Sequence, residues 1–195
     1  MCSFGNKETI ARPKNGRVFL SRFNLKPLAD LTAHIIFWSA AAAGVVLDLW
    51  SKNEIFKYLQ SRNIDNISVI SGFLNIVRAE NTGAAFGIAA GMYRLLMVVS
   101  IIALIIIVLL FLFGREKSRP FYLALGFFAA GISGNLYDRI FNEGRVRDFI
   151  DVVYWPGRHW PAFNVADSLL CIAVGIILLL SFTETLYRTR GRQQK

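Results

Sequence analysis

The chain is poor in charged residues, in cysteine and in histidine. Charged side chains make up 18% of its 195 residues and hydrophobic ones 54%, against about 25% and about 45–50% in average soluble domains. This balance excludes a disordered chain and argues against an ordinary soluble domain. The two cysteines, Cys2 and Cys171, are too few for a disulfide framework or a thiolate metal site. His34 and His159 lie far apart with no ligand spacing, so we expect neither a metal nor another cofactor.

Long apolar runs are what the chain has instead. Residues 95–113 hold one serine and no charge, and at about 1.5 Å per residue they would span roughly 28 Å, close to the thickness of a bilayer core. Three further stretches, 31–50, 121–137 and 162–182, are comparable and become polar at one end only. The sequence therefore predicts an all-α integral membrane protein with four transmembrane helices.

The distribution of basic residues predicts an orientation. Residues 1–30, 114–120 and 183–195 together hold 13 Lys and Arg but four Asp and Glu, whereas the rest of the chain holds nine of each sign. The whole net charge of +9 therefore falls on these three segments. Because cytoplasmic loops carry the excess of Lys and Arg, we expect both termini in the cytoplasm and residues 51–94 and 138–161 outside it.

The same pattern predicts one domain with two basic ends. Residues 31–185 form the domain, with a basic extension over 1–30 and a basic tail over 186–195. The extension either lies on the anionic inner leaflet or is a disordered tail without function, and no nucleic-acid motif accompanies it. A rival interpretation makes residues 31–47 the core of a cleaved signal peptide. The three later spans would still make the chain a membrane protein.

One outer loop is expected to fold. Residues 67–77 are too short to span a membrane and carry β-branched and aromatic residues around Ser71-Gly72. This pattern predicts two short strands in a small extracytoplasmic sheet between the first and second helices. The strongly charged segment 138–149 is interpreted as a solvated loop. Ala130 and Gly134 form a small-x-x-x-small pair that predicts close packing of the third helix.

Polar residues gather at the predicted outer ends of the spans. Placing a carboxylate at that depth in the membrane costs free energy unless it is paired or hydrated, so carboxylates there are candidates for function. For any single residue, an interfacial charge that faces water is the competing interpretation. The group consists of Asp48 and Lys52 at the first span, Asn135, Asp138 and Arg139 at the third, and Asn164 and Asp167 at the fourth.

Some of these residues also have purely local interpretations. Asp48 and Lys52 stand at i and i+4, the spacing of a helical ion pair. Asn164 and Asp167 have the N-cap and N3 spacing of a capping box. The segment 81–87, Asn-Thr-Gly-Ala-Ala-Phe-Gly, is either an ordinary turn or a place where glycine permits close approach of another backbone.

The residue types leave carboxylate chemistry as the candidate reaction. A serine or cysteine nucleophile lacks a base, because neither histidine shares a site with one. Two carboxylates that share one proton can activate a water, one acting as base while the other polarises a carbonyl. Composition alone does not identify which two.

Five segments, in this order and spacing, resemble the lipoprotein signal peptidase family, also called signal peptidase II. Each motif is weak alone, but all five together on a chain with four predicted spans are highly specific. The resemblance covers roughly residues 31–185. The segments are DLWSK at 48–52, NTGAAFG at 81–87, GNLYDR at 134–139, VRDF at 146–149 and FNVAD at 163–167.

The resemblance implies an aspartyl endopeptidase of the bacterial inner membrane. It would remove the signal peptide of diacylated prolipoproteins just before the lipid-modified cysteine, with its active site near the outer leaflet. The implied catalytic pair is Asp148 and Asp167, with Asp138 as a structural residue paired with a nearby arginine. The residues implied to bind substrate or support the site are Asn81, Gly83, Asn135, Arg139 and Asn164, with Asp48 and Lys52 as a pair at its rim.

Two departures from the family pattern stand out. Arg147 occupies a position before the catalytic aspartate that is commonly hydrophobic, and the loop from Asp138 to Asp148 is about one residue longer than usual. An arginine turned into the site would hold Asp148 ionised, so we expect Arg147 to point to water.

The expected partners are a diacylated prolipoprotein and membrane lipid, with no nucleic acid, and the chain is expected to be a monomer. Two other classes compete with the peptidase. A proton-coupled transporter or channel would spread its charges through the depth of the bilayer. If the chain were a structural membrane partner without catalysis, replacing both aspartates would not affect lipoprotein maturation.

Overall fold

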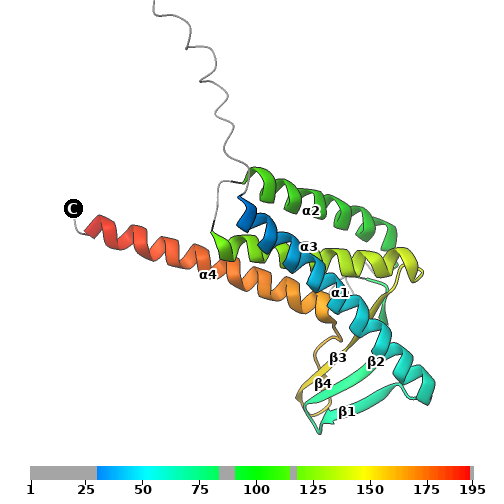
Figure 1. Ribbon diagram of the computed structural model, residues 1–195. Helices are drawn as coiled ribbons and strands as arrows, with labels where there is room; N and C mark the ends of the chain where they lie inside the picture. The colour runs from blue at the N-terminus through cyan, green and yellow to red at the C-terminus, as the bar shows by residue number, and fades with distance from the viewer. Residues whose placement is uncertain (1–29, 84–90, 115–117, 194–195) are drawn as a thin grey trace, which may run out of the picture.

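The computed structural model describes residues 30–83, 91–114 and 118–193, and it is predominantly helical with one small antiparallel sheet (Figure 1). The predicted N-terminal extension lies almost entirely outside the described residues. The helices are α1 (Leu31–Arg62), α2 (Tyr93–Phe113), α3 (Arg119–Phe141) and α4 (Val165–Gln193), and the strands are β1 (Asn66–Ile70), β2 (Leu74–Asn81), β3 (Val146–Trp155) and β4 (Arg158–His159).

Helix α3 lies at the centre of the helical layer, in contact with α1, α2 and α4. Its small residues make this possible. A Cβ added at Gly126 would stand 2.8 Å from the backbone oxygen of Phe37, and one added at Gly134 would collide with the Asp48 carboxylate. The prediction that α3 packs closely around Ala130 and Gly134 is confirmed, since a Cβ added at Gly44 of α1 would stand 2.6 Å from the Ala130 Cβ.

Within the described residues, three helices are long and apolar enough to cross a membrane, namely Leu31–Arg62, Tyr93–Phe113 and Val165–Leu186. On α2 the side chains of Val98, Ile102, Ile105 and Leu109 follow helical spacing and are all exposed. In water such a continuous apolar face would be costly, whereas lipid solvates it. The remaining predicted span, residues 121–137, corresponds to α3, which is less apolar because it is enclosed by the other helices, and its status as a span stays a prediction.

Aromatic packing ties three helices together at the end of the bundle away from the sheet. The rings of Phe37 on α1 and Phe111 on α2 stack with centroids 4.1 Å apart, and Tyr122 on α3 meets Phe111 edge-on. Phe37 and Phe111 are almost completely buried. This cluster fixes the spacing of α1, α2 and α3, and so the position of their opposite ends.

Helix α1 is longer than predicted. It continues past residue 50 to Arg62 and ends at Asn63, whose left-handed conformation lets its N–H bond to the Gln60 and Leu59 carbonyls. The expectation that Asp48 and Lys52 end the first helix is therefore wrong. Both residues lie in the middle of α1. Their side chains are on the side of the helix that faces α3, and they are fully buried. Helix α4 likewise runs beyond residue 182.

The sheet is larger than the predicted hairpin. The two strands expected within 67–77 are confirmed as β1 and β2, which turn at Gly72 with a φ of +73°. However, β3 pairs with the other edge of β2, and β4 pairs with β3, in the order β1-β2-β3-β4. The interpretation of residues 138–149 as a solvated loop is wrong at both ends. Residues 138–141 belong to α3, with Asp138 buried. From Val146 on the chain forms β3, because the backbone N–H and C=O groups on the second edge of β2 need hydrogen-bond partners.

Substituting a glycine of α3 tests the close helix packing. Gly131→Ala would place a Cβ 2.6 Å from both the Ala166 oxygen and the Leu170 Cγ, and overpacking of this kind costs about 1–3 kcal/mol. We expect a lower unfolding midpoint in detergent, measured by a thermal scan. Gly175→Ala on α4 is the matched control, because the added Cβ would have no atom within 4 Å. It should leave the midpoint unchanged or raise it. Equal midpoints for the two variants would contradict the packing.

Candidate functional site

The predicted site residues come together where α1, α3, the start of α4 and β3 meet. Three carboxylates, one lysine and one asparagine are almost fully buried there, which is unusual for such side chains. Each needs a partner, and the partners define the geometry of the site. The five are Asp48, Lys52, Asp138, Asp148 and Asn164.

The first turn of α4 positions Asp167. Its backbone N–H donates to the Asn164 Oδ1 at 3.0 Å, and its own Oδ2 accepts the Asn164 N–H at 3.3 Å. This is the reciprocal capping box that the spacing predicts. The other carboxylate oxygen, Oδ1, accepts from the Asn135 side-chain amide at 2.8 Å. Asp167 therefore caps the helix with one oxygen and faces the rest of the site with the other.

Strand β3 brings Asp148 to the same place. Its carboxyl oxygen Oδ1 accepts from the Asn164 Nδ2 at 2.6 Å, and its exposed fraction is 2%. The strand is held there by register, since Asp148 stands opposite Ala79 of β2. Asn164 thus bonds to both carboxyl groups, through its side chain to Asp148 and through its backbone to Asp167.

The environment of Asp148 disfavours its charged form. Burial and, after it, the negative charge of Asp167 raise the pKa of Asp148 from 3.8 to about 7. Hydrogen bonds from Asn164 and Asn81 and the positive charge of Lys52 act in the opposite direction. Near neutral pH, Asp148 is thus able to hold a proton that an exposed aspartate would lose.

The side-chain amide of Asn135 links this pair to a buried cation. Its Oδ1 accepts from the Lys52 ammonium at 3.0 Å and from the Asn164 Nδ2 at 3.1 Å. With the oxygen so engaged, the Asn135 nitrogen is left to donate to Asp167. Lys52 therefore fixes which end of the amide faces the carboxylate.

Lys52 and Asp48 lie beneath the site and not at its rim, which corrects the expectation from the family resemblance. Lys52 Nζ stands 2.7 Å from Asp48 Oδ2 and 3.3 Å from Asp138 Oδ2, and both carboxylate side chains are inaccessible to solvent. Asp48 Oδ1 accepts the Ala166 N–H at 2.8 Å. The pair therefore joins α1 to both α3 and α4.

Arg147 does not point to water, which corrects a second expectation. Its guanidinium contacts Asp138 Oδ1 through Nε at 3.1 Å and through a terminal nitrogen at 2.7 Å, and 19% of the side chain is exposed. The expectation that Asp138 pairs with a nearby arginine is confirmed, and Arg147 is that arginine. The only sequence signal was a charge beside Asp148, which fits an exposed strand residue equally well.

Arg139 and Gly83 meet at the outer side of the site. Arg139 donates to the Gly83 carbonyl at 2.9 Å and to the Asn135 carbonyl at 3.3 Å. Asn81 Oδ1 accepts the Gly83 N–H at 2.9 Å and shapes the turn. Residues 84–87 of the predicted glycine-rich segment lie outside the described residues. The described part of that segment is therefore bound to α3 through one arginine.

Other polar groups are separate from this site. His34 packs edge-on against the Phe111 ring, and His159 Nδ1 contacts both oxygens of Asp151 at 2.9 Å. Asp151 also accepts from Asn75 at 2.8 Å, a contact between strands that the sequence interpretation missed. Among residues 30–83, 91–114 and 118–193 no group of three or more His, Cys, Asp or Glu is placed to hold a metal.

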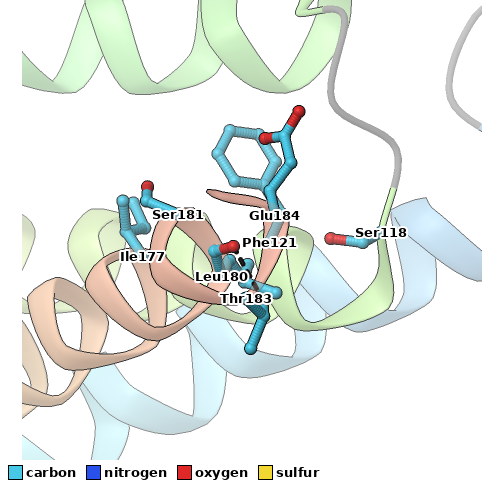
Figure 2. A pocket seen from close by; sticks show the side chains of 7 residues that line it. All are labelled: Ser118, Phe121, Ile177, Leu180, Ser181, Thr183 and Glu184. Atoms are coloured by element: carbon cyan, nitrogen blue, oxygen red, sulfur yellow. Dashed lines mark hydrogen bonds between the residues drawn. The ribbon is translucent and has the colours of Figure 1, made fainter. Parts of the chain in front are cut away.

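Two hollows accompany the helices. A groove of about 610 Å³ touches the site through Arg139 and is otherwise lined by Tyr93, Met97, Ile140, Glu143 and Gly144. A second cavity, of about 320 Å³, lies between the start of α3 and the second half of α4, away from Asp148 and Asp167 (Figure 2). Its lining residues include Ser118, Phe121 and Glu184. The groove is lined by a residue of the candidate site, Arg139, whereas the cavity of Figure 2 is not.

Comparison with known proteins gives a consistent result. The family model described as signal peptidase (SPase) II matches residues 40–183. Lipoprotein signal peptidases of Sulfurihydrogenibium sp. and Geobacter sulfurreducens are 42% and 39% identical to the chain, over 71% and 73% of it and 84% and 88% of their own lengths. That of Rhodopirellula baltica is 36% identical over 76% of this chain and 72% of its own.

Solved structures agree with these matches. A bacterial membrane enzyme determined by the in meso method at 2.3 Å resolution superposes with a TM-score of 0.66 at 33% identity, over 79% of this chain and 89% of the other. Another, at 1.9 Å, gives a TM-score of 0.61 at 34% identity, over 76% of this chain and 91% of the other. The resemblance seen in the five motifs extends to the fold.

The raised pKa of Asp148 predicts how stability depends on pH. A carboxyl with a raised folded-state pKa binds its proton more tightly when folded, so stability is lost as pH rises from about 4 to about 7. Asp148→Asn removes this charge, so its unfolding midpoint should exceed that of the unmodified protein at pH 8, by a margin that shrinks toward pH 5. The measurement is a thermal scan in detergent across that range.

A surface variant provides the control for this pH series. Asp65→Asn removes a carboxylate that is 77% exposed and pairs with Arg78. It should shift the midpoint little at any pH. A margin for Asp148→Asn that stays constant from pH 5 to pH 8 would show that Asp148 ionises normally.

Proposed function

Because the chain belongs to the signal peptidase II family, we propose that it removes the signal peptide of diacylated prolipoproteins with the pair Asp148 and Asp167. The family match supports a membrane peptidase that acts on lipoprotein signal peptides. The proposal adds the catalytic pair, a water between its members and the bond that is cut. The observation that carries it is that one residue, Asn164, hydrogen-bonds both carboxyl groups.

The two aspartates have unequal surroundings, which supports separate roles. Both oxygens of Asp167 accept N–H donors, and the residue stands in the first turn of α4, where the helix dipole favours a negative charge. Asp148 is buried on a strand with its pKa raised to about 7. In the proposal Asp167 is the ionised base and Asp148 holds the shared proton, while the titration belongs to the pair as a whole.

The proposed reaction follows from these roles. Asp167 takes a proton from the water as the water oxygen attacks the carbonyl carbon preceding the lipid-modified cysteine. Asp148 donates its hydrogen bond to the carbonyl oxygen, which becomes negative in the transition state. The C–N bond then breaks as the amide nitrogen receives a proton from the pair. The products are a signal peptide with a free carboxylate and a lipoprotein with a free cysteine amine.

The proposed placement in the membrane puts this chemistry where the substrate lies. We propose that α3 is a fourth span, that both termini are cytoplasmic and that the site lies near the outer leaflet of the bacterial inner membrane. The enclosed position of α3 and the basic segments at one end support this arrangement. The acyl chains of the substrate would then remain in lipid. The groove beside Arg139 provides an apolar approach, through Met97 and Ile140.

A proton-coupled transporter is the competing class, and the charge distribution speaks against it. Such a protein needs ionisable groups along its transport path. In the described part of the chain the fully buried charged side chains, Asp48, Lys52 and Asp138, gather at one end of the bundle. Helix α2 carries no charge after Arg94.

Replacing either catalytic candidate should abolish cleavage. We expect Asp148→Asn and Asp167→Asn each to lower the cleavage rate by about 10²- to 10⁴-fold, because each removes one partner of the acid–base pair. The assay incubates purified protein with a diacylated prolipoprotein and follows its mobility on a gel, with and without a chelator. Chelator-resistant cleavage supports a carboxylate mechanism.

A matched control lies one strand away. Glu80 of β2 stands opposite Arg147 and pairs with the half-exposed Arg145 at 2.7 Å. Glu80→Gln therefore removes a nearby carboxylate outside the pair, and we expect cleavage within twofold of the unmodified protein. Full activity in folded Asp148→Asn or Asp167→Asn would overturn the assignment.

The proposed topology predicts which sites react with an impermeant thiol reagent. In a background with Cys2 and Cys171 replaced by alanine, Ser71→Cys in the β1–β2 turn should be labelled in intact cells. Gln194→Cys, in the basic tail, should be labelled only after the membrane is opened. The reverse pattern would place the sheet in the cytoplasm.

A further inference from the structure

Arg147 contacts the candidate site through its backbone N–H, its carbonyl and two of its guanidinium nitrogens. Its guanidinium holds Asp138 Oδ1 through two nitrogens, and its backbone N–H donates to Asp138 Oδ2 at 3.0 Å. Its carbonyl accepts from the Asn164 Nδ2 at 3.3 Å, the same nitrogen that donates to Asp148. One residue therefore connects the end of α3 to the asparagine that contacts both aspartates.

The ion pair also balances a buried cluster of charges. Asp138 stands between Arg147 and Lys52, and Lys52 also holds Asp48. Within ion-pair distance of one another stand two carboxylates and two cations, whereas without Arg147 one buried lysine would pair with both carboxylates. An uncompensated buried charge is strongly unfavourable. Loss of Arg147 would therefore draw Lys52 toward Asp138 and away from Asn135, whose amide orients Asp167.

We propose that Arg147 is a positioning residue: by clamping Asp138 it anchors β3 to α3, and so holds Asp148 against Asn164. The inference rests on the proposed function, because it concerns the placement of the proposed pair. The Arg147 guanidinium holds Asp138, which is not a member of the proposed pair, so the residue acts on Asp148 through other groups. A guanidinium suits this role because two of its nitrogens, fixed in one planar fork, donate to the same Asp138 oxygen, which the single ammonium of a lysine cannot do.

The clamp has a kinetic signature. When it is lost, Asp148 shifts and gains contact with water, and a misplacement of about 1 Å can cost 10²-fold in rate. The charges that face Asp148 are those of Asp167, Lys52 and Arg139. Those that face Asp138 are the carboxylate of Asp48 and the cations Lys52, Arg139 and Arg147. Hydration of Asp148 returns its pKa toward the usual range, so the alkaline limb of the pH–rate profile moves to lower pH.

The test compares Arg147→Met with Arg145→Met on a diacylated prolipoprotein substrate. Arg145 lies two residues earlier, and its side chain is 46% exposed and paired with Glu80 and Glu143 at the surface. We expect Arg147→Met to lower kcat by about 10- to 100-fold, with KM within twofold and the alkaline limb shifted to lower pH. Arg145→Met should change neither kcat nor the limb.

Two further variants separate positioning from loss of folding. Arg147→Lys keeps the charge without the fork, and we expect an intermediate kcat. The double variant Asp138→Asn with Arg147→Met removes both charges. Its kcat should be no lower than that of Arg147→Met alone, because the remaining charges of Asp48 and Lys52 neutralise each other. If Arg147→Met is not recovered folded, Arg147→Lys decides by the same two readouts, kcat and the limb.

The outcomes are distinct. An unmodified protein that fails to cleave removes the proposed function itself. An active unmodified protein together with an Arg147→Met variant of equal kcat removes the inference alone. So does a kcat loss that leaves the pH profile in place and follows the fraction of folded enzyme, since that is what a purely structural residue would give.

Discussion

Every charge buried between α1, α3, α4 and β3 must have a partner, and this requirement shapes the end of the helical bundle that meets the sheet. Lys52 is fully buried, which is tolerated because Asp48, Asp138 and Asn135 surround its ammonium group. To supply these partners α1 must lie against α3 closely enough that Gly134 has no room for a side chain. The buried ion pairs therefore depend on the small residues of α3, which let α1 approach closely.

The same network makes the two candidate catalytic aspartates unequal. Asp167 belongs to a helix N-terminus, where one of its oxygens accepts a backbone N–H, and its other oxygen accepts from the Asn135 side-chain amide. Asp148 belongs to a buried strand and depends on side-chain amides. A pair with one member that favours its charge and one that resists it is suited to share a single proton. Asn164 and Asn135 keep the pair in register without adding charge.

The family relationship and the individual residues explain different things. Similarity over residues 40–183 accounts for the helical fold, the sheet and the class of reaction. It does not account for Arg147, whose pairing with Asp138 is read from this chain's own contacts. That pairing shows why an arginine beside a buried aspartate need not bind that aspartate: a second carboxylate, Asp138 on α3, holds its guanidinium group instead.

The sequence by itself determined the apolar helices, the β1–β2 hairpin, the capping box of Asn164 and Asp167, and the ion pair of Asp48 and Lys52, because each depends on residues a few positions apart. Tertiary structure alone decided that residues 146–155 become a strand, that α1 runs on to Arg62 and that Arg147 holds Asp138. Those outcomes depend on partners distant in the chain: β3 forms because β2 has an unpaired edge, and Lys52 is buried because α3 brings Asp138 and Asn135 to it. Local patterns carry no record of such partners, since a charged residue in water and one in a buried ion pair have the same sequence neighbours.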